Sequence, residues 1–247
     1  MIRICVAFIL IFISSIGRAD EVVDIPSAHV IPTRVLISYT QAAKATVLLY
    51  IGGGGLLRIP EDGRINHIHT FVRSFRFWRD YEVQAVLIDS PIDLGNARLG
   101  HRRGSKDHLD RVSEVIRYFN SKSSRPIWIF GHSMGTSTVA AFLNSEKPEV
   151  FHLRGYIVAG THKGESIPTS IKLPALGIHH KREACPSTPI WASEDIIKSR
   201  TSDTPRAMVL LDGGSDEGDR CQAMAYHGFN GIERELIKTA AEFILKN

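Results

Sequence analysis

Gly-His-Ser-Met-Gly, residues 131–135, is the part of the sequence from which the fold prediction starts. Apolar, β-prone residues at 126–130 precede it, as in a buried parallel strand, and residues 136–143 can continue as a helix packed on that strand. The turn between them needs glycines, because side chains two positions before and after Ser133 would collide with the neighbouring strand and helix. The pattern predicts a Ser133 hydroxyl held at the carboxyl edge of a sheet, above a helix N-terminus that favours negative charge.

Strand and helix patterns alternate along the rest of the chain. Further strands are expected at residues 45–51, 83–88, 155–159, 174–178 and 207–211, with one or two edge strands between 30 and 39. Helices are expected over 66–80, after Ser105, over 191–199, and at the C-terminus, where Asn230 and Glu233 match a capping box. This alternation predicts an α/β fold: a mostly parallel central sheet with helices on both faces. Residues 160–173 leave no room for a large cap domain.

The first nineteen residues have the composition of a signal peptide. Arg3 precedes an almost wholly apolar run, and small residues stand near Ala19. The run is too short to span a bilayer comfortably, so cleavage after Ala19 is expected. The remaining chain, residues 20–247, is predicted to be a single domain without a stable membrane anchor, exported to the periplasm or the medium.

The charge balance of the expected mature chain is mild. Loss of Arg3 and Arg18 lowers the formal net charge from +4 to +2, which does not indicate binding to nucleic acid. One basic cluster is predicted to be a solvated loop beside a helix start, with an anion-binding patch as the alternative. It comprises Arg98, His101, Arg102, Arg103 and Lys106.

Two cysteines remain after the signal peptide, which contains Cys5, is removed. Cys185 and Cys221 form an even pair in a chain bound for an oxidising compartment. The sequence therefore predicts a disulfide between them.

Ser133 can act as a nucleophile only if a base takes its proton. Partners of that kind are expected on loops at the carboxyl ends of neighbouring strands. His227 fits best, because it lies between the last predicted strand and the last predicted helix, in a loop with two glycines. His132, inside the motif, points away from any position suited to a base. The pairs His67/His69 and His179/His180 lack further ligands at recognisable spacing, so no metal site is expected.

A carboxylate is needed to orient the histidine. Glu183 follows the strand predicted at 174–178 and is preferred, while Asp212 and Asp216, which follow the last strand, remain alternatives. A Cys185–Cys221 bridge would tie the loop of Glu183 to the loop of His227, which supports the choice of Glu183.

Backbone amides are the expected donors to an oxyanion. One is the N–H of Met134, directly after Ser133; the other is expected from the four glycines at 52–55, with Gly53 and Gly54 preferred. These glycines are not followed by Gly-Lys-Ser/Thr and fit no dinucleotide fingerprint, so they do not indicate a nucleotide site.

As a set, these features resemble the α/β-hydrolase superfamily, over essentially the whole of residues 20–247. The shared features are the glycine-rich turn after an early strand, the Gly-x-Ser-x-Gly motif, and the chain order serine, acid, histidine. The resemblance implies an eight-stranded sheet and a triad of Ser133, Glu183 and His227. Two differences stand out: the family more often uses Asp as the acid, and many members have His-Gly where this chain has Ile51-Gly52.

The resulting expectation is an exported serine hydrolase that cleaves an ester or related acyl bond of a small molecule through an acyl-enzyme, without a cofactor. Thioesterase, peptidase and acyltransferase activities use the same triad and remain alternatives. A further alternative is a non-catalytic binding protein on the same fold. The sequence does not indicate the oligomeric state.

Overall fold

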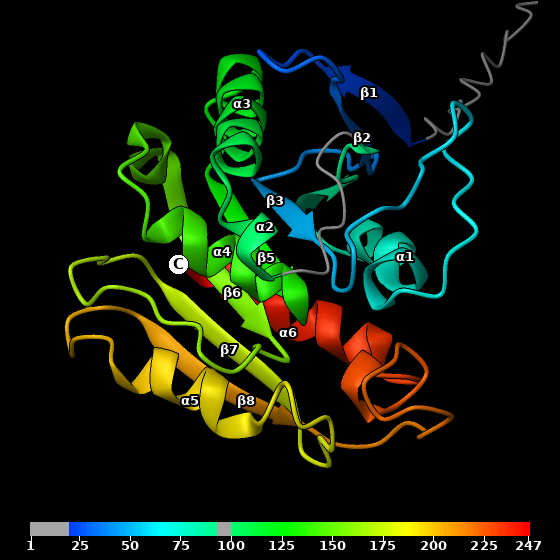
Figure 1. Cartoon of the computed structure of the whole chain (residues 1–247), viewed down its shortest axis with the longest axis vertical. Helices are drawn as coiled ribbons and strands as arrows, with labels where there is room; N and C mark the ends of the chain where they lie inside the picture. Colours follow the sequence, from blue (N-terminus) through cyan, green and yellow to red (C-terminus); the bar gives the residue numbers. More distant parts are fainter. Residues whose placement is uncertain (1–19, 93–99) are drawn as a thin grey trace, which may run out of the picture.

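The computed structural model describes residues 20–92 and 100–247. The predicted signal peptide, residues 1–19, lies outside the described residues, as does Arg98. Eight strands form one sheet in the order β1-β2-β4-β3-β5-β6-β7-β8 (Figure 1). Their bounds are β1 Glu21–Ile25, β2 Thr33–Ile37, β3 Ala45–Tyr50, β4 Val83–Ile88, β5 Ile127–His132, β6 Leu153–Ala159, β7 Ala175–His180 and β8 Arg206–Leu211.

Most neighbouring strands of the sheet run parallel, as the alternation of strands and helices predicts. The pairs β1–β2 and β2–β4 are antiparallel, and all pairs from β4 through β3 to β8 are parallel. β3 lies between β4 and β5, with Leu48 opposite Ile129. The carboxyl ends of β3, β5, β6, β7 and β8 therefore meet at one edge of the sheet, where the loops that carry the predicted site residues begin.

The continuous apolar runs fill both faces of the sheet. In β3, Val47 and Leu49 join one core cluster while Leu48 and Tyr50 join the other, because successive side chains of a strand point to opposite faces. Helices α1 and α6 contribute to the first cluster and α3, α4 and α5 to the second. The helices are α1 Thr70–Ser74, α2 Gly100–Arg103, α3 Lys106–Lys122, α4 Met134–Leu143, α5 Ile190–Lys198 and α6 Glu233–Lys246, with 3₁₀ turns η1 Phe75–Asp80, η3 Pro148–His152 and η4 Tyr226–Gly228.

Two local predictions need correction. The helix expected over 66–80 is a short α1 followed by the 3₁₀ turn η1. The expected capping box at the C-terminal helix is absent: α6 begins at Glu233 after Ile232, which makes no side-chain cap. The side chain of Asn230 instead donates to Ser215 Oγ at 2.9 Å, and to a backbone carbonyl. Hydrogen bonds to Ser215 and to a backbone carbonyl therefore replace the helix cap that the local sequence pattern predicts for Asn230.

The carboxyl edge of the sheet carries no inserted domain between β6 and β7. Residues 160–174 contain no helix or strand, in agreement with the prediction of a fold without a large cap. Among residues 20–92 and 100–247, no helix has the length and apolar character needed to cross a membrane.

Candidate active site

Ser133 stands on a strained turn between β5 and α4. Its backbone has φ 54° and ψ −126°, a sparsely populated conformation for a residue with a side chain. Glycines are required on both sides: a Cβ at Gly131 would lie 2.3 Å from the Gly135 carbonyl oxygen, and one at Gly135 would lie 1.9 Å from the Tyr50 oxygen. The Ser133 amide donates to Ala159 O in β6 at 2.9 Å. Packing against two neighbouring strands thus holds the serine in place, as the motif predicts, with its side chain only partly buried.

Glu183 and His227 meet at the ends of β7 and β8. Glu183 Oε2 lies 2.9 Å from His227 Nδ1, and both side chains are almost completely buried. A carboxylate only accepts hydrogen bonds, so Nδ1 carries the proton and Nε2 keeps its lone pair. This is the tautomer that a general base requires. The other carboxylate oxygen, Oε1, accepts from the Cys185 amide at 2.8 Å, which fixes the orientation of the group.

The alternative acids lie elsewhere. Asp212 is exposed and pairs with Lys181 and Arg182. Asp216 accepts from the Tyr226 amide at 3.3 Å. Of the three candidate carboxylates, the structure brings Glu183 to the histidine.

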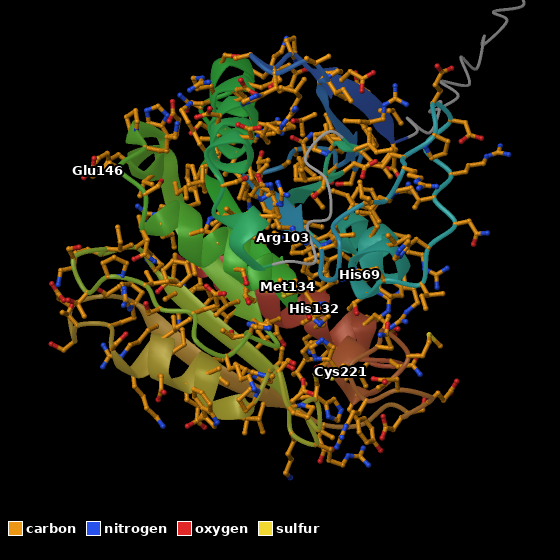
Figure 2. The ribbon with its side chains drawn as sticks, viewed as in Figure 1. His69, Arg103, His132, Met134, Glu146 and Cys221 are labelled. Carbon is orange, nitrogen blue, oxygen red and sulfur yellow. A yellow bond between two sulfur atoms is a disulfide. The ribbon has the colours of Figure 1, made fainter. Side chains whose placement is uncertain are left out.

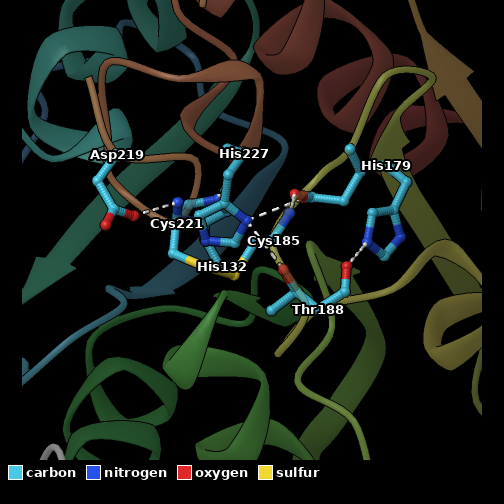
Figure 3. Close-up of a disulfide and its surroundings, with 8 residues drawn as sticks. His132, His179, Cys185, Thr188, Asp219, Cys221 and His227 are labelled. Carbon is cyan, nitrogen blue, oxygen red and sulfur yellow. Dashed lines mark hydrogen bonds and ion pairs between the residues drawn. A yellow bond between two sulfur atoms is a disulfide. The ribbon is translucent and has the colours of Figure 1, made fainter. Parts of the chain in front are cut away.

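Thr188 is a further contact of His227 that the sequence did not single out. Its Oγ1 lies 3.1 Å from His227 Nδ1, and its carbonyl accepts from His179 Nε2 at 3.0 Å. Figure 3 shows this network around the histidine. Thr188 is buried, three residues after Cys185, and its amide bonds back to the Cys185 carbonyl. A threonine in a loop has no local signature, so only the folded loop reveals this contact.

The structure contains the predicted disulfide between Cys185 and Cys221, with sulfur atoms 2.08 Å apart (Figure 3). It joins the loop after β7, which carries Glu183, to the loop after β8, which carries His227. Because the Cys185 amide also holds the Glu183 carboxylate, the bridge and the ion pair share one short segment.

His227 lies beside the strand end that holds Ser133. A Cβ at Gly160 would lie 3.2 Å from His227 Cε1, and Gly160 follows Ala159, the residue that bonds the Ser133 amide. Among the described residues, no hydrogen bond joins Ser133 Oγ to His227. Catalytic hydrogen bonds are often long in structures without substrate and tighten in the complex.

A glycine loop, residues 51–55, borders the other side of Ser133. A Cβ at Gly52 would lie 2.9 Å from Ser133 Cβ, so the loop packs directly against the serine. Gly53 has φ +56°, a conformation that glycine adopts without strain. Met134 is the first residue of α4, and such a residue has no acceptor for its amide within the helix. The sequence predicts Met134, Gly53 and Gly54 as the oxyanion donors. Met134 directly follows Ser133, and Gly53 and Gly54 belong to the loop that packs against the serine through Gly52.

Two buried histidines connect the regions on either side of Ser133. His132 Nε2 donates to the His227 carbonyl at 2.9 Å, and His132 Nδ1 lies 3.3 Å from His69 Nε2. His69 faces the amide of Gly52 at 2.9 Å and that of Phe71 at 3.1 Å. A neutral imidazole has one lone pair, so His69 binds one of these two amides at a time.

The same two histidines are neutral near pH 7. Burial lowers the pKa of His132 to about 3, helped by the nearby His227, and burial also moves the pKa of His69 well below its ordinary value. Sequence reasoning considered His69 only as a metal ligand. Among the described residues, no group of three or more histidine, cysteine, aspartate and glutamate side chains is placed to hold a metal ion.

Arg103 is not in a solvated loop, contrary to the prediction for the basic cluster. Its side chain is 1% exposed, whereas the neighbouring Arg102 is exposed. It donates to the carbonyls of Ile51 and Gly53 in the glycine loop. Figure 2 shows Arg103, Met134, His69 and His132 grouped near the middle of the molecule. Adjacent arginines look alike in a sequence, and only the packing of α2 separates their environments.

The sequence matches no family model and no curated protein. Solved structures do match. Dienelactone hydrolase from Anabaena variabilis ATCC 29413 superposes with a TM-score of 0.64 at 17% identity, covering 92% of this chain and 97% of that one. XC6422 from Xanthomonas campestris, named as a member of the a/b serine hydrolases without lid, gives 0.58 at 11% identity, covering 90% and 95%. Thermogutta terrifontis esterase 2, phosphoramylated by tabun, gives 0.60 at 12% identity, covering 92% and 94%. At such identities these similarities establish the fold.

Proposed function

We propose that this chain, which has the α/β-hydrolase fold, is an exported serine hydrolase that cleaves an ester or related acyl bond of a small molecule. One observation carries the proposal. The buried Glu183 carboxylate, 2.9 Å from His227 Nδ1, leaves the base nitrogen Nε2 free, at the sheet edge where a strained turn presents Ser133. The names of the similar structures, among them a dienelactone hydrolase and an esterase, support a small acyl substrate.

In the acylation step, Ser133 Oγ attacks the substrate carbonyl carbon and its proton passes to His227 Nε2. Glu183 stabilises the imidazolium that forms. The carbonyl oxygen becomes an oxyanion, for which the Met134 amide and those of Gly53 and Gly54 are the proposed donors. The α4 N-terminus adds a favourable field at the same place.

The tetrahedral intermediate then breaks down. The bond from the carbonyl carbon to the leaving oxygen breaks, and the leaving group takes the proton from His227, so that an acyl-Ser133 ester remains. A water molecule attacks this ester and gives its proton to His227. The acid product departs while Ser133 Oγ recovers the proton from the histidine. No step requires a redox reagent or an electrophile other than the substrate carbonyl.

Export is part of the same proposal. The Cys185–Cys221 disulfide supports it, because structural disulfides persist in oxidising compartments. The signal-like composition of residues 1–19 supports it as well.

A non-catalytic binding protein is the second candidate, and the missing Ser133–His227 hydrogen bond favours it. In that case the serine would not be activated. A fluorophosphonate probe separates the two functions, because it labels only an activated serine.

The test is a Ser133→Ala substitution, with an exposed serine on α3, Ser121→Ala, as the matched control. We expect the wild type and the control to hydrolyse short p-nitrophenyl esters and to react with the probe. Ser133→Ala should lower kcat/KM by roughly 10⁴–10⁶-fold, with an unchanged unfolding midpoint. Equal turnover in wild type and Ser133→Ala, or a wild type that the probe does not label, would refute the proposed function.

A further inference from the structure

Arg103 is a buried cation with no carboxylate partner in the part of the chain that the structure describes. Its guanidinium donates to Ile51 O at 3.0 Å, to Gly53 O at 2.9 Å and to Thr138 Oγ1 at 3.3 Å, all of them neutral acceptors. Among residues 20–92 and 100–247, no acidic side chain forms an ion pair with it, and its Nε has no hydrogen-bond partner.

Burial of such a group lowers the free energy of unfolding. An ionised side chain taken out of water is normally compensated by an opposite charge. Burial lowers the pKa of Arg103 to about 10, so the side chain remains protonated at neutral pH. Apolar residues could fill the same space at lower cost, which points to a role for the charge and its hydrogen bonds beyond packing.

The orientation of the glycine loop follows from these bonds. A trans peptide group places its C=O and its N–H in opposite directions, and the described chain has no cis peptide bond. With the Ile51 carbonyl on Arg103, the Gly52 amide must point away from the guanidinium, and it does face His69. By the same geometry, the Gly53 carbonyl on Arg103 turns the Gly54 amide away from the guanidinium.

At Gly52, the side of the loop opposite Arg103 is the side of His69 and Ser133. Gly52 packs against Ser133, and His69, which faces the Gly52 amide, contacts His132. Arg103 also reaches Thr138 on α4, the helix that begins with Met134. One side chain therefore connects the two elements that carry the expected oxyanion donors.

We propose that Arg103 is a positioning residue for the oxyanion site: it holds the glycine loop against α4 so that the Gly54 amide faces the reacting carbonyl together with that of Met134. The proposal rests on the proposed function. The cation also polarises the two peptide groups that it binds, which strengthens their amides as donors. The effect is on the transition state, in which the oxyanion forms, and not on the substrate ground state.

The test compares Arg103→Met, Arg103→Lys and the matched control Arg102→Met, an exposed neighbour on the same helix. Hydrolysis of p-nitrophenyl acetate gives kcat and KM, and an alkyl trifluoromethyl ketone, which forms a tetrahedral oxyanion with an active serine, gives an inhibition constant. The corresponding alkyl methyl ketone reports ground-state binding. Thermal unfolding of each protein checks its fold.

For Arg103→Met we expect kcat to fall by roughly 10–10²-fold with KM changed less than about threefold. Inhibition by the trifluoromethyl ketone should weaken by the same factor as kcat, while the methyl ketone should be unaffected. Arg103→Lys, which keeps the charge but not the planar fork, should recover part of kcat. Arg102→Met should match the wild type.

A folded Arg103→Met protein with wild-type kcat overturns the proposal, as does a loss that affects both ketones equally. If Arg103→Met does not fold, Arg103→Lys decides: wild-type kcat and wild-type trifluoromethyl ketone inhibition overturn the proposal, and a selective loss of both supports it. A wild type without turnover or fluorophosphonate labelling refutes the proposed function, and this inference with it. Failure of the inference alone leaves that labelling intact.

Discussion

The regions on the two sides of Ser133 are held by different chemistry. On the histidine side, which comprises the loops at 181–189 and 212–230, a disulfide and a buried carboxylate–imidazole pair join two segments that are far apart in sequence. On the other side, the glycine loop is held by hydrogen bonds from Arg103 and faces His69, without a covalent link.

Position in the sheet explains the difference. The glycine loop follows β3, whose residues are all buried and which lies between β4 and β5. The hydrogen bonds at the start of the loop, to Ile51 O and from the Gly52 amide, are therefore buried. The histidine side extends to β8, the last strand of the sheet, most of whose residues are partly or fully exposed. Loops at such an edge have less core to rest on, and a cross-link compensates by restricting the unfolded chain. One site thus combines buried hydrogen bonds on its well-covered side with a disulfide on its exposed side.

The largest effect in this comparison is expected from Glu183→Gln. A glutamine amide can donate to Nδ1 and so stabilises the tautomer that has its proton on Nε2, which cannot act as a base. We expect kcat to fall by roughly 10³–10⁴-fold with little change in the unfolding midpoint. Asp212→Asn, which replaces the exposed alternative acid, is the control and should retain activity. If Asp212→Asn were the inactive variant, the assignment of the acid would be wrong.

Removal of the Cys185–Cys221 disulfide should have the next largest effect. In Cys185→Ser/Cys221→Ser, we expect the free energy of unfolding to fall by about 3–4 kcal/mol, the chain-entropy value for a 36-residue separation. Activity should also fall, because the Cys185 amide that aligns Glu183 is no longer anchored. Denaturant titration and esterase assays measure both.

Reduction of the disulfide by dithiothreitol provides the control for the double variant. It should reproduce both losses in the wild type and leave the double variant unchanged. If activity persists while stability falls, the disulfide stabilises the fold but is not needed to position Glu183. Both sides of Ser133 would then be positioned by noncovalent contacts.

The smallest effect concerns His132, which joins the two sides. Burial lowers its pKa from the usual 6.5 to about 3. Between these values the unfolded chain binds a proton that the folded chain does not, so the free energy of unfolding falls as the pH falls, by about 1.4 kcal/mol per pH unit for this one proton. Other buried histidines, among them His108, with a pKa of about 3, add to the same slope.

Denaturant titrations at pH 6.5, 6.0 and 5.5 can isolate that contribution, because most carboxylates remain ionised in this range. His132→Gln should reduce the pH slope, whatever its absolute stability. The exposed His152→Gln should keep the wild-type slope. Identical slopes in all three proteins would contradict a buried, neutral His132.

Much of the site is readable from local pattern. The glycines around Ser133 indicate that backbone segments approach each other closely there, since no side chain fits at Gly131 or Gly135. The positions of Glu183 and His227 follow from their places after β7 and β8 together with the convergence of parallel strand ends. The cysteine pair is predictable because only two cysteines remain in the expected mature chain.

No local sequence pattern predicts the contacts that complete the site. Thr188, His69 and Arg103 come from loops or short helices, and each acts through a partner far away in sequence. The failed capping box at Asn230 has the same origin: its amide finds better partners in another loop than in the helix that follows. Tertiary partners outcompete local ones where they offer more hydrogen bonds.

Periodicity, glycine sterics and chain order are properties of short segments, so they sufficed to predict strands β2 to β8, the strained serine turn, the disulfide and the order of the residues proposed as a triad. They did not predict β1, Glu21–Ile25, at the edge of the sheet. Tertiary packing was needed to show that Glu183 and not Asp212 reaches His227, and that one of two adjacent arginines is buried behind the glycine loop. These outcomes depend on the directions in which loops leave the sheet. Those directions are set by the packing of the whole domain and by no local run of residues.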